Sequence, residues 1–197
     1  MVEEVDVAIV GYGPVGQAAA AWLSRAGHRV AAFERFEEIY RLPRAVHMDH
    51  EIMRLMQDLG LAERLVEGMV PLSDYLWFGA DGEPVMTLNS PRPTESGWEP
   101  SYLFFQPELE EALCDAGRPA VEVNRGWVVR EVEDQGDGVE LTVGRCVGPT
   151  NGAAASDEVR GVRARWVIGT DGANSLLREN AGIPRRDHGF QERWLVV

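Results

Sequence analysis

Three glycines near the N-terminus have the spacing of a phosphate-binding turn. The segment Gly11-Tyr12-Gly13-Pro14-Val15-Gly16 fits the pattern G-x-G-x-x-G. In this pattern the first glycine allows a tight turn, the second leaves the backbone open to a pyrophosphate, and the third lets a helix pack closely on a strand. The start of the helix offers N–H groups and a partial positive charge to an anion. The pattern predicts a dinucleotide phosphate site formed by Gly11, Gly13, Pro14, Val15 and Gly16.

An acidic residue follows the glycine pattern at the distance expected of a ribose-binding carboxylate. Glu34 lies 34 − 16 = 18 positions after Gly16. Its carboxylate can accept hydrogen bonds from both ribose hydroxyls of an adenosine, and it would repel a 2′-phosphate, which argues against NADP at this site. These residues do not separate NAD from FAD. The simpler alternative is a glycine-rich turn beside a surface glutamate.

The glycine pattern lies between the elements that it requires. Val5–Val10 is rich in β-branched residues and is expected to be a buried parallel strand,. The alanine-rich stretch from Pro14 to Ala26 predicts a helix, which Gly27 closes,. Arg29–Phe33 predicts the second strand, so strand, helix and strand fit within about thirty residues. The sequence therefore predicts an α/β fold with a Rossmann-like βαβ unit and a parallel sheet.

The middle of the chain alternates between helical and strand patterns. Met48–Leu59 predicts a helix with one apolar face, made of Ile52, Leu55, Met56 and Leu59,. Two short strands, Tyr75–Phe78 and Pro84–Leu88, are expected to pair through a turn at Asp81-Gly82,. A second helix is expected over Pro107–Ala116, followed by a strand over Ala120–Val123,.

The last third of the chain predicts a three-stranded antiparallel meander at about residues 125–165. Its strands are Trp127–Glu133, Val139–Val147 and Val159–Arg165, with turns at residues 136–138 and 148–157,. Trp166–Ile168 then predicts a return to the parallel sheet, ending at Gly169-Thr170-Asp171-Gly172. Asp171 would lie at the carboxyl end of a parallel strand, where open α/β sheets bind ligands. The simpler alternative is an Asp-Gly turn without a ligand.

Composition narrows the class of protein. The 197 residues are 45% hydrophobic, as expected of a globular protein, and carry a formal net charge of −13,. This acidity argues against nucleic acid and anionic membranes as partners. The acidic N-terminus does not resemble a secretory signal, and Cys114 and Cys146 lack metal-ligand spacing, so we expect free thiols in the cytoplasm,. His47, Asp49 and His50 suggest a metal site, but His47 and His50 precede or begin a helix and no third convergent ligand is apparent, which disfavours it,.

Several segments together resemble the class A flavoprotein monooxygenases, which have the p-hydroxybenzoate hydroxylase fold. The resemblance is strongest to the 3-(3-hydroxyphenyl)propionate hydroxylase group and covers nearly the whole chain. The segments that carry it are the glycine pattern, Glu34-Arg35, residues 42–51 (LPRAVHMDHE), 77–82 (WFGADG), 102–109 (YLFFQPEL) and 169–175 (GTDGANS). The resemblance implies that FAD is the cofactor and that NAD(P)H and O2 are used to hydroxylate a phenolic substrate.

The resemblance also implies roles for single residues. Arg44 would contact the ribityl and pyrophosphate region of FAD, and a guanidinium after a proline-stiffened turn suits a diphosphate. Gln106 would bind the same region, the Val129 backbone would contact the adenine, and Asp171 with Gly172 would support the pyrophosphate. Arg35 is carried over with Glu34 as a cofactor-binding residue. The alternatives are a solvated or ion-paired Arg44 and a Gln106 that only begins a helix.

The resemblance assigns residues 1–70 and 101–180 to the FAD-binding domain, and residues 71–100 and 181–197 to the beginnings of substrate-domain segments. Family members are longer, and their third flavin motif has no counterpart here. We therefore expect a fragment or one half of a split protein, with weak FAD binding and no hydroxylation in isolation. Its partners would be a small aromatic substrate and either a second copy or a complementing C-terminal chain. The competing hypotheses are a non-catalytic nucleotide-binding module and an NAD-dependent dehydrogenase.

Overall fold

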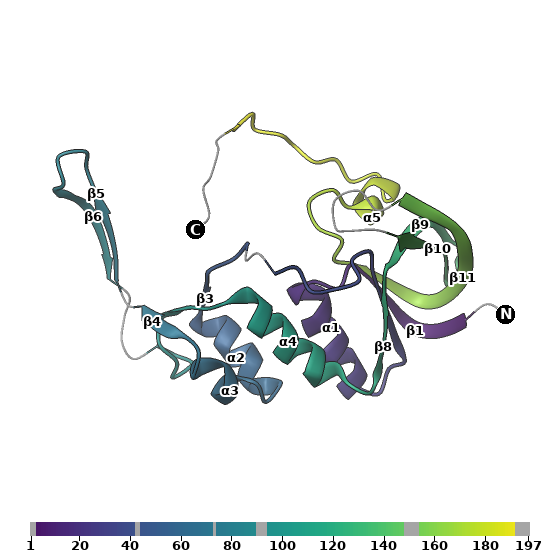
Figure 1. The fold of residues 1–197 in the computed structure, drawn as a ribbon, viewed down its shortest axis with the longest axis horizontal. Helices are drawn as coiled ribbons and strands as arrows, with labels where there is room; N and C mark the ends of the chain where they lie inside the picture. The colour runs from purple at the N-terminus through teal and green to yellow at the C-terminus, as the bar shows by residue number, and fades with distance from the viewer. Residues whose placement is uncertain (1–2, 42–43, 73, 90–93, 148–153, 192–197) are drawn as a thin grey trace. The chain divides into compact units, whose positions relative to one another are not determined.

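A computed structural model of the chain describes residues 3–41, 44–72, 74–89, 94–147 and 154–191. The chain divides into two compact units, the first made of Met1–Tyr40 with Leu113–Val197 and the second of Arg41–Ala112. Figure 1 shows the ribbon, coloured from purple at the N-terminus to yellow at the C-terminus.

The first unit is built on a six-stranded mixed sheet with the order β8-β2-β1-β11-β10-β9. The pairs β8–β2, β2–β1 and β1–β11 are parallel, whereas β11–β10 and β10–β9 are antiparallel. The strands are β1 (Glu3–Val10), β2 (Val30–Glu34), β8 (Val121–Arg125), β9 (Trp127–Asp134), β10 (Val139–Val147) and β11 (Ala154–Gly169). The predicted α/β fold with a βαβ unit, a parallel sheet and a meander is confirmed.

Alternation along β1 divides the core of this unit into two layers. Val7 and Ile9 are buried with residues of α1 (Pro14–Arg25) and with Val121. Ala8 and Val10 belong to a second buried cluster, which includes Leu141 and Val143 of the meander. Successive side chains of a strand point to opposite faces, so one strand contributes to both layers.

One strand prediction needs correction. We expected Val159–Arg165 and Trp166–Ile168 to be separate strands, but β11 runs without a break through both segments, and Figure 1 shows it as one long curved arrow. It pairs antiparallel with β10 along its first part and parallel with β1 along its second part. Val162, Arg163 and Ala164 pair with β10 on one edge and with β1 on the other, so the strand passes without interruption from one pairing to the next. Of the turn expected at 148–157, residues 148–153 lie outside the described residues, and Ala154 already belongs to β11.

The second unit includes two complete helices, the first part of a third, a small sheet and a hairpin. The helices are α2 (His50–Asp58) and α3 (Ala62–Val66), and the antiparallel sheet has the order β3-β7-β4, with β3 (His47–Asp49), β4 (Val70–Leu72) and β7 (Ser101–Leu103). The predicted hairpin is confirmed as β5 (Asp74–Phe78) paired with β6 (Pro84–Asn89). Its turn includes Gly82 at φ +81°, a conformation that glycine adopts without strain,. The strands β3, β4 and β7 are only three residues long and were not predicted.

The helix expected over Met48–Leu59 begins two residues later, and its predicted apolar face is buried at Met56 and Leu59 but not at Ile52. Asp49 is its N-cap, and the carboxylate accepts a hydrogen bond from Ile52 N–H at 3.0 Å,. Met48 therefore lies in β3. Ile52 is 38% exposed, whereas Met53 is fully buried, so the predicted apolar face was wrong at that position.

Two further helices complete the described chain. The predicted second helix is confirmed as α4 (Gln106–Gly117), which runs across the sequence boundary between the two units. A short α5 (Leu176–Asn180) follows β11 in the first unit. Among the described residues, no helix is long and apolar enough to cross a membrane.

Candidate nucleotide-binding site

Gly11 and Gly16 are required by close packing. Gly11 follows β1 at φ +91°, and its N–H donates a hydrogen bond to the Phe33 carbonyl at 2.9 Å. A Cβ at Gly11 would lie 2.8 Å from the Cα of Asp171, and a Cβ at Gly16 would lie 2.8 Å from Oγ1 of Thr170. Side chains at either position would force the backbone apart, so these glycines hold the turn, the helix and the end of β11 together.

Gly13, in contrast, faces open space. A Cβ at this position would meet no other atom within 4 Å. Gly13 is the N-cap of α1, no side chain caps this helix end, and Pro14 occupies the first turn. Val15 is 70% exposed. The first-turn N–H groups are therefore presented to an outside anion and not to a side chain of the helix itself, which suits a pyrophosphate.

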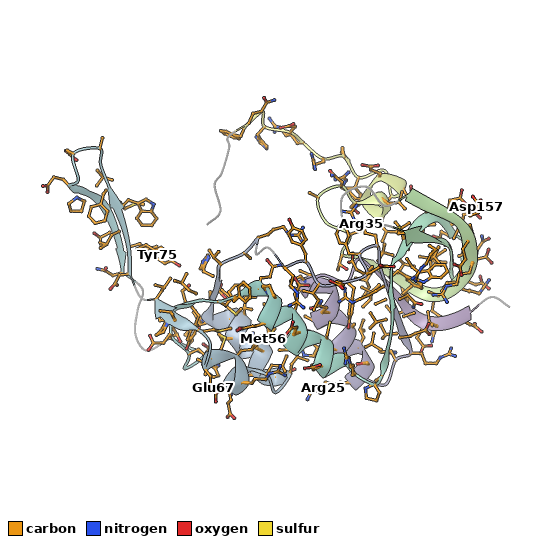
Figure 2. All side chains as sticks on the ribbon, in the orientation of Figure 1. Arg25, Arg35, Met56, Glu67, Tyr75 and Asp157 are labelled. Carbon is orange, nitrogen blue, oxygen red and sulfur yellow. The ribbon has the colours of Figure 1, made fainter. Side chains whose placement is uncertain are left out.

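Glu34 ends β2 and lies against the glycine turn. Its Oε2 accepts a hydrogen bond from the Tyr12 N–H at 2.8 Å, and its Oε1 accepts one from the Phe36 N–H at 3.1 Å. A carboxylate has about four acceptor sites, so two such bonds leave capacity for hydroxyl donors. Arg35, labelled in Figure 2, is exposed, and its guanidinium lies 4.7 Å from the centre of the Phe36 ring.

Tyr12 anchors the turn from inside the protein, a role that the motif did not indicate. Its side chain is 1% exposed and lies in the core layer beneath α1. The Arg125 guanidinium lies 5.6 Å from the ring centre. Burial raises the pKa of the Tyr12 hydroxyl to about 12,. An aromatic residue between the first two glycines was the only signal available in the sequence.

The segment after β11 packs directly on the glycine turn. The Thr170 N–H donates to the Val10 carbonyl at 2.8 Å, and Oγ1 donates to the Gly11 carbonyl at 2.6 Å. Asp171 Oδ2 accepts a hydrogen bond from the Leu177 N–H of α5 at 3.3 Å, and Gly172 has φ +79°. The predicted Asp171-Gly172 turn therefore lies beside Gly11, and Thr170 is a connecting residue that the sequence motif did not indicate.

Val129 lies in β9, one of the two edge strands of the six-stranded sheet. It is 5% exposed and pairs with Val143 of β10. Near the start of the same strand, the Arg160 guanidinium lies 4.4 Å from the centre of the Trp127 ring. The expected contact between the Val129 backbone and an adenine stays a prediction.

The second unit holds the remaining two predicted residues, Arg44 and Gln106, in contact with each other. Gln106 is 4% exposed, and its carbonyl oxygen accepts hydrogen bonds from the Arg44 N–H at 2.8 Å and the Ala45 N–H at 3.0 Å. Its amide nitrogen donates to the buried Glu110 carboxylate at 2.8 Å. Gln106 therefore fixes the backbone that carries Arg44, while the Arg44 side chain itself is exposed.

The histidine-rich segment of this unit forms structural contacts. Asp49 caps α2, and Nδ1 of His50 lies 3.1 Å from Oγ of Ser96. Within the described ranges, no group of three or more His, Cys, Asp or Glu side chains is arranged to hold a metal ion.

Comparisons with known proteins agree on one family. A family model described as an FAD binding domain matches residues 4–197. The chain is 40% identical over 198 residues to "Probable NADH-specific resorcinol 4-hydroxylase" of Rhodococcus jostii (strain RHA1), covering 98% of this chain and 35% of that protein. It is 32% identical over 197 residues to a 3-(3-hydroxy-phenyl)propionate/3-hydroxycinnamic acid hydroxylase of Paraburkholderia xenovorans (strain LB400), covering 98% and 30%.

A solved structure agrees with this result. The p-nitrophenol 4-monooxygenase PnpA from Pseudomonas putida DLL-E4 superimposes with a TM-score of 0.78 at 25% identity, over 92% of this chain and 44% of that one. The chain spans about a third of the length of the curated relatives that it matches.

Proposed function

We propose, since this chain belongs to the family of FAD-binding domains, that it is the FAD-binding part of a flavin-dependent monooxygenase that hydroxylates a phenolic ring with NAD(P)H and O2. The resemblance to the class A flavoprotein monooxygenases is confirmed by the family match and by the hydroxylases among its relatives. The relatives' names specify resorcinol and 3-hydroxyphenylpropionate, which supports a small phenolic compound as the substrate class here.

One observation carries the proposal for the cofactor. The uncapped N-terminus of α1, with an open face at Gly13, follows the glycine turn at Gly11, and the carboxylate of Glu34 is bonded to that turn at the Tyr12 N–H. A pyrophosphate and an adjoining ribose match this order of donors and acceptor. We propose that FAD is bound here and supplies the electron transfer and oxygen chemistry.

We propose a separate task for each side chain. The first turn of α1, at Pro14, Val15 and Gly16, receives the pyrophosphate, and Glu34 accepts the ribose hydroxyls with Arg35 beside it. Asp171 and Gly172 support the pyrophosphate from the end of β11, and the Val129 backbone contacts the adenine. These roles use groups that lie around the glycine turn and in the edge strand β9 of the first unit.

For the second unit, we propose that Arg44 contacts the diphosphate and that Gln106 contributes in two ways. Its carbonyl holds the Arg44 backbone, as the hydrogen bonds describe. A primary amide has two N–H donors, of which Glu110 accepts one,. The second donor is the one that we propose for FAD.

The remaining assignments are also proposals. Residues 1–70 and 101–180 would make up the FAD-binding domain, with the substrate domain beginning at 71–100 and 181–197, of which 192–197 lie outside the described residues. The partners would be a small aromatic substrate and either a second copy of the chain or a complementing C-terminal chain, with the cytoplasm as the compartment. An aromatic substrate is supported by the relatives' names.

A ligand series tests the proposed function. The purified 197-residue chain is titrated with FAD, ADP, NAD⁺ and riboflavin, with binding followed by calorimetry. We expect FAD to bind most tightly, ADP to bind through the pyrophosphate and ribose contacts, and riboflavin, which lacks both, to bind far more weakly. Tighter binding of NAD⁺ than of FAD would favour the dehydrogenase alternative, and binding of none of them would reject the proposal.

A further inference from the structure

The peptide bond between Gly11 and Tyr12 is held from both sides by side chains. On one side, the Gly11 carbonyl accepts a hydrogen bond from Oγ1 of Thr170 at 2.6 Å. On the other side, the Tyr12 N–H donates to Oε2 of Glu34 at 2.8 Å. The carbonyl and the N–H of a trans peptide are part of one rigid plane and point in opposite directions. The orientation of this single plane therefore decides both hydrogen bonds together.

The ends of this peptide are fixed, but its plane is not fixed by the backbone alone. The Gly11 N–H bonds to the Phe33 carbonyl at 2.9 Å, and the Tyr12 side chain is buried in the core. A glycine can adopt several backbone conformations at little cost, so the plane of the Gly11–Tyr12 peptide can rotate between its two fixed ends. A rotated peptide would turn the Gly11 carbonyl toward the Glu34 carboxylate, and Glu34 would lose the donor that holds its Oε2.

Thr170 is placed to select one orientation. Its backbone N–H is bonded to the Val10 carbonyl at 2.8 Å, which fixes the residue against the end of β1. Its hydroxyl lies between the first and third glycines, because a Cβ at Gly16 would approach Oγ1 to 2.8 Å. The hydroxyl is 3.1 Å from the Val10 carbonyl and 2.6 Å from the Gly11 carbonyl, so the bond to Gly11 dominates,.

We propose that Thr170 is a positioning residue that acts through the Gly11–Tyr12 peptide to hold the Glu34 carboxylate in the orientation that receives the adenosine ribose. The inference rests on the proposed function of the site. It gives Thr170 a role in recognising a sugar that its own side chain does not contact. Thr170 and Glu34 are bonded to the same peptide group, so the effects of their substitutions on binding should not add.

Three variants test this inference in the full 197-residue chain. Thr170→Val removes the hydroxyl and keeps the shape, Thr170→Ser keeps the hydroxyl, and Glu34→Gln weakens the acceptor. The affinities for ADP and 2′-deoxy-ADP are measured by calorimetry, because a loss of ribose recognition changes their ratio, whereas general loosening lowers both affinities alike. Circular dichroism defines a temperature at which each variant is folded, and Thr170→Ala replaces Thr170→Val if the latter does not fold.

We expect Thr170→Val to weaken ADP binding about 3- to 10-fold and to lower the preference for ADP over 2′-deoxy-ADP. Thr170→Ser should restore both to within about twofold of wild type. In the Glu34→Gln background, Thr170→Val should cost less than about twofold, because the carboxylate that it positions is gone. Equal losses in both backgrounds, or an unchanged ratio of the two ligands, would overturn the inference while leaving the proposed function intact. A wild-type chain that binds neither ADP nor FAD would reject the proposed function, and this inference with it.

Discussion

Glu34 in the first unit and Gln106 in the second both hold backbone N–H groups in place, but they do so with different chemical groups. Each side chain accepts hydrogen bonds from two backbone N–H groups. The donors to Glu34 are Tyr12 of the glycine turn and Phe36, and the donors to Gln106 are Arg44 and Ala45. Glu34 is a partly buried carboxylate that uses one oxygen for each donor. Gln106 is a buried amide that uses one oxygen for both donors and is itself held by Glu110.

The difference follows from burial. An ionised side chain is costly to bury without full compensation, whereas a neutral amide loses little once both of its ends are bonded. The charged group therefore lies at the partly exposed position, and the neutral group lies at the buried one. We infer that the Glu34 contact contributes mainly to binding and the Gln106 contact mainly to holding the fold.

The largest effect expected is at Gly11. Gly11→Ala would strain a backbone at φ +91° and drive the new methyl into Asp171, so the free energy of unfolding should fall by about 3 kcal/mol or more. Gly13→Ala is the matched control, because its Cβ meets nothing within 4 Å. Its stability should stay within about 0.5 kcal/mol of wild type while FAD binding falls. Urea denaturation and FAD titration measure the two effects, and a destabilised Gly13→Ala would contradict the distinction between the two glycines.

The second-largest effect is expected on stability when Gln106 loses its hydrogen bonds. Gln106→Leu removes the acceptor of the Arg44 and Ala45 N–H groups and the donor to Glu110. We expect a loss of about 2–4 kcal/mol in the free energy of unfolding. Glu110→Gln keeps a carbonyl acceptor for the Gln106 amide and should cost clearly less. If urea midpoints show the two variants to be equally stable, the buried amide is not what holds this segment.

The buried Tyr12 predicts a specific alkaline instability. Its pKa is raised from 10.0 to about 12 by burial, so its stabilising contribution is complete below pH 10 and is lost as the pH rises through 12. The loss should reach about 2–3 kcal/mol. Tyr12→Phe should lack this component, and since the chain contains no lysine, few other groups titrate in this range. The free energy of unfolding of both proteins is measured by urea denaturation between pH 9 and 12. If it falls with pH by the same amount in wild type and in Tyr12→Phe, the assignment is disproved.

A smaller effect is expected at Arg44, where binding and not folding should respond. Arg44→Ala should weaken FAD binding about 10- to 100-fold, the range for losing a charged hydrogen bond, with little change in stability because the side chain is exposed. Arg41→Ala is the matched control, since Arg41 is an exposed arginine of the same unit, paired with Glu111 at 2.8 Å. Equal losses in FAD affinity for both variants would indicate a general charge effect.

The smallest effect is expected at Asp6, whose carboxylate also accepts a hydrogen bond from a backbone N–H group but in an exposed position. Asp6 accepts a hydrogen bond from the Arg29 N–H at 2.8 Å, which is the main cause of its lowered pKa. Its stabilising contribution is therefore present above about pH 4 and is lost as the pH falls through the lowered pKa. The difference in urea midpoint between wild type and Asp6→Ala should be small at pH 6 and vanish at lower pH. A difference that grows on acidification would contradict the sign.

Much of the fold could be predicted because its signals are local. The βαβ unit, the hairpin at Gly82 and the helix beginning at Gln106 each follow from short patterns of apolar residues, glycine and proline. The errors arose where a local pattern allowed two solutions. Ile52 and Met53 are both apolar, and the packing of α2 in the folded chain decided that Met53 and not Ile52 is buried. The continuity of β11 likewise depends on its partners on both edges.

The sequence by itself determined the glycine turn, the acidic residue at the end of β2 and the family to which they point, because spacing along one βαβ unit fixes their chemistry. Only the tertiary structure brought Thr170 to Gly11, 159 positions away, and Gln106 to Arg44, 62 positions away. Such contacts depend on which strands become neighbours and which segment lies beside a helix start. No local propensity encodes that choice, since it is made by burying the apolar faces of the whole chain together.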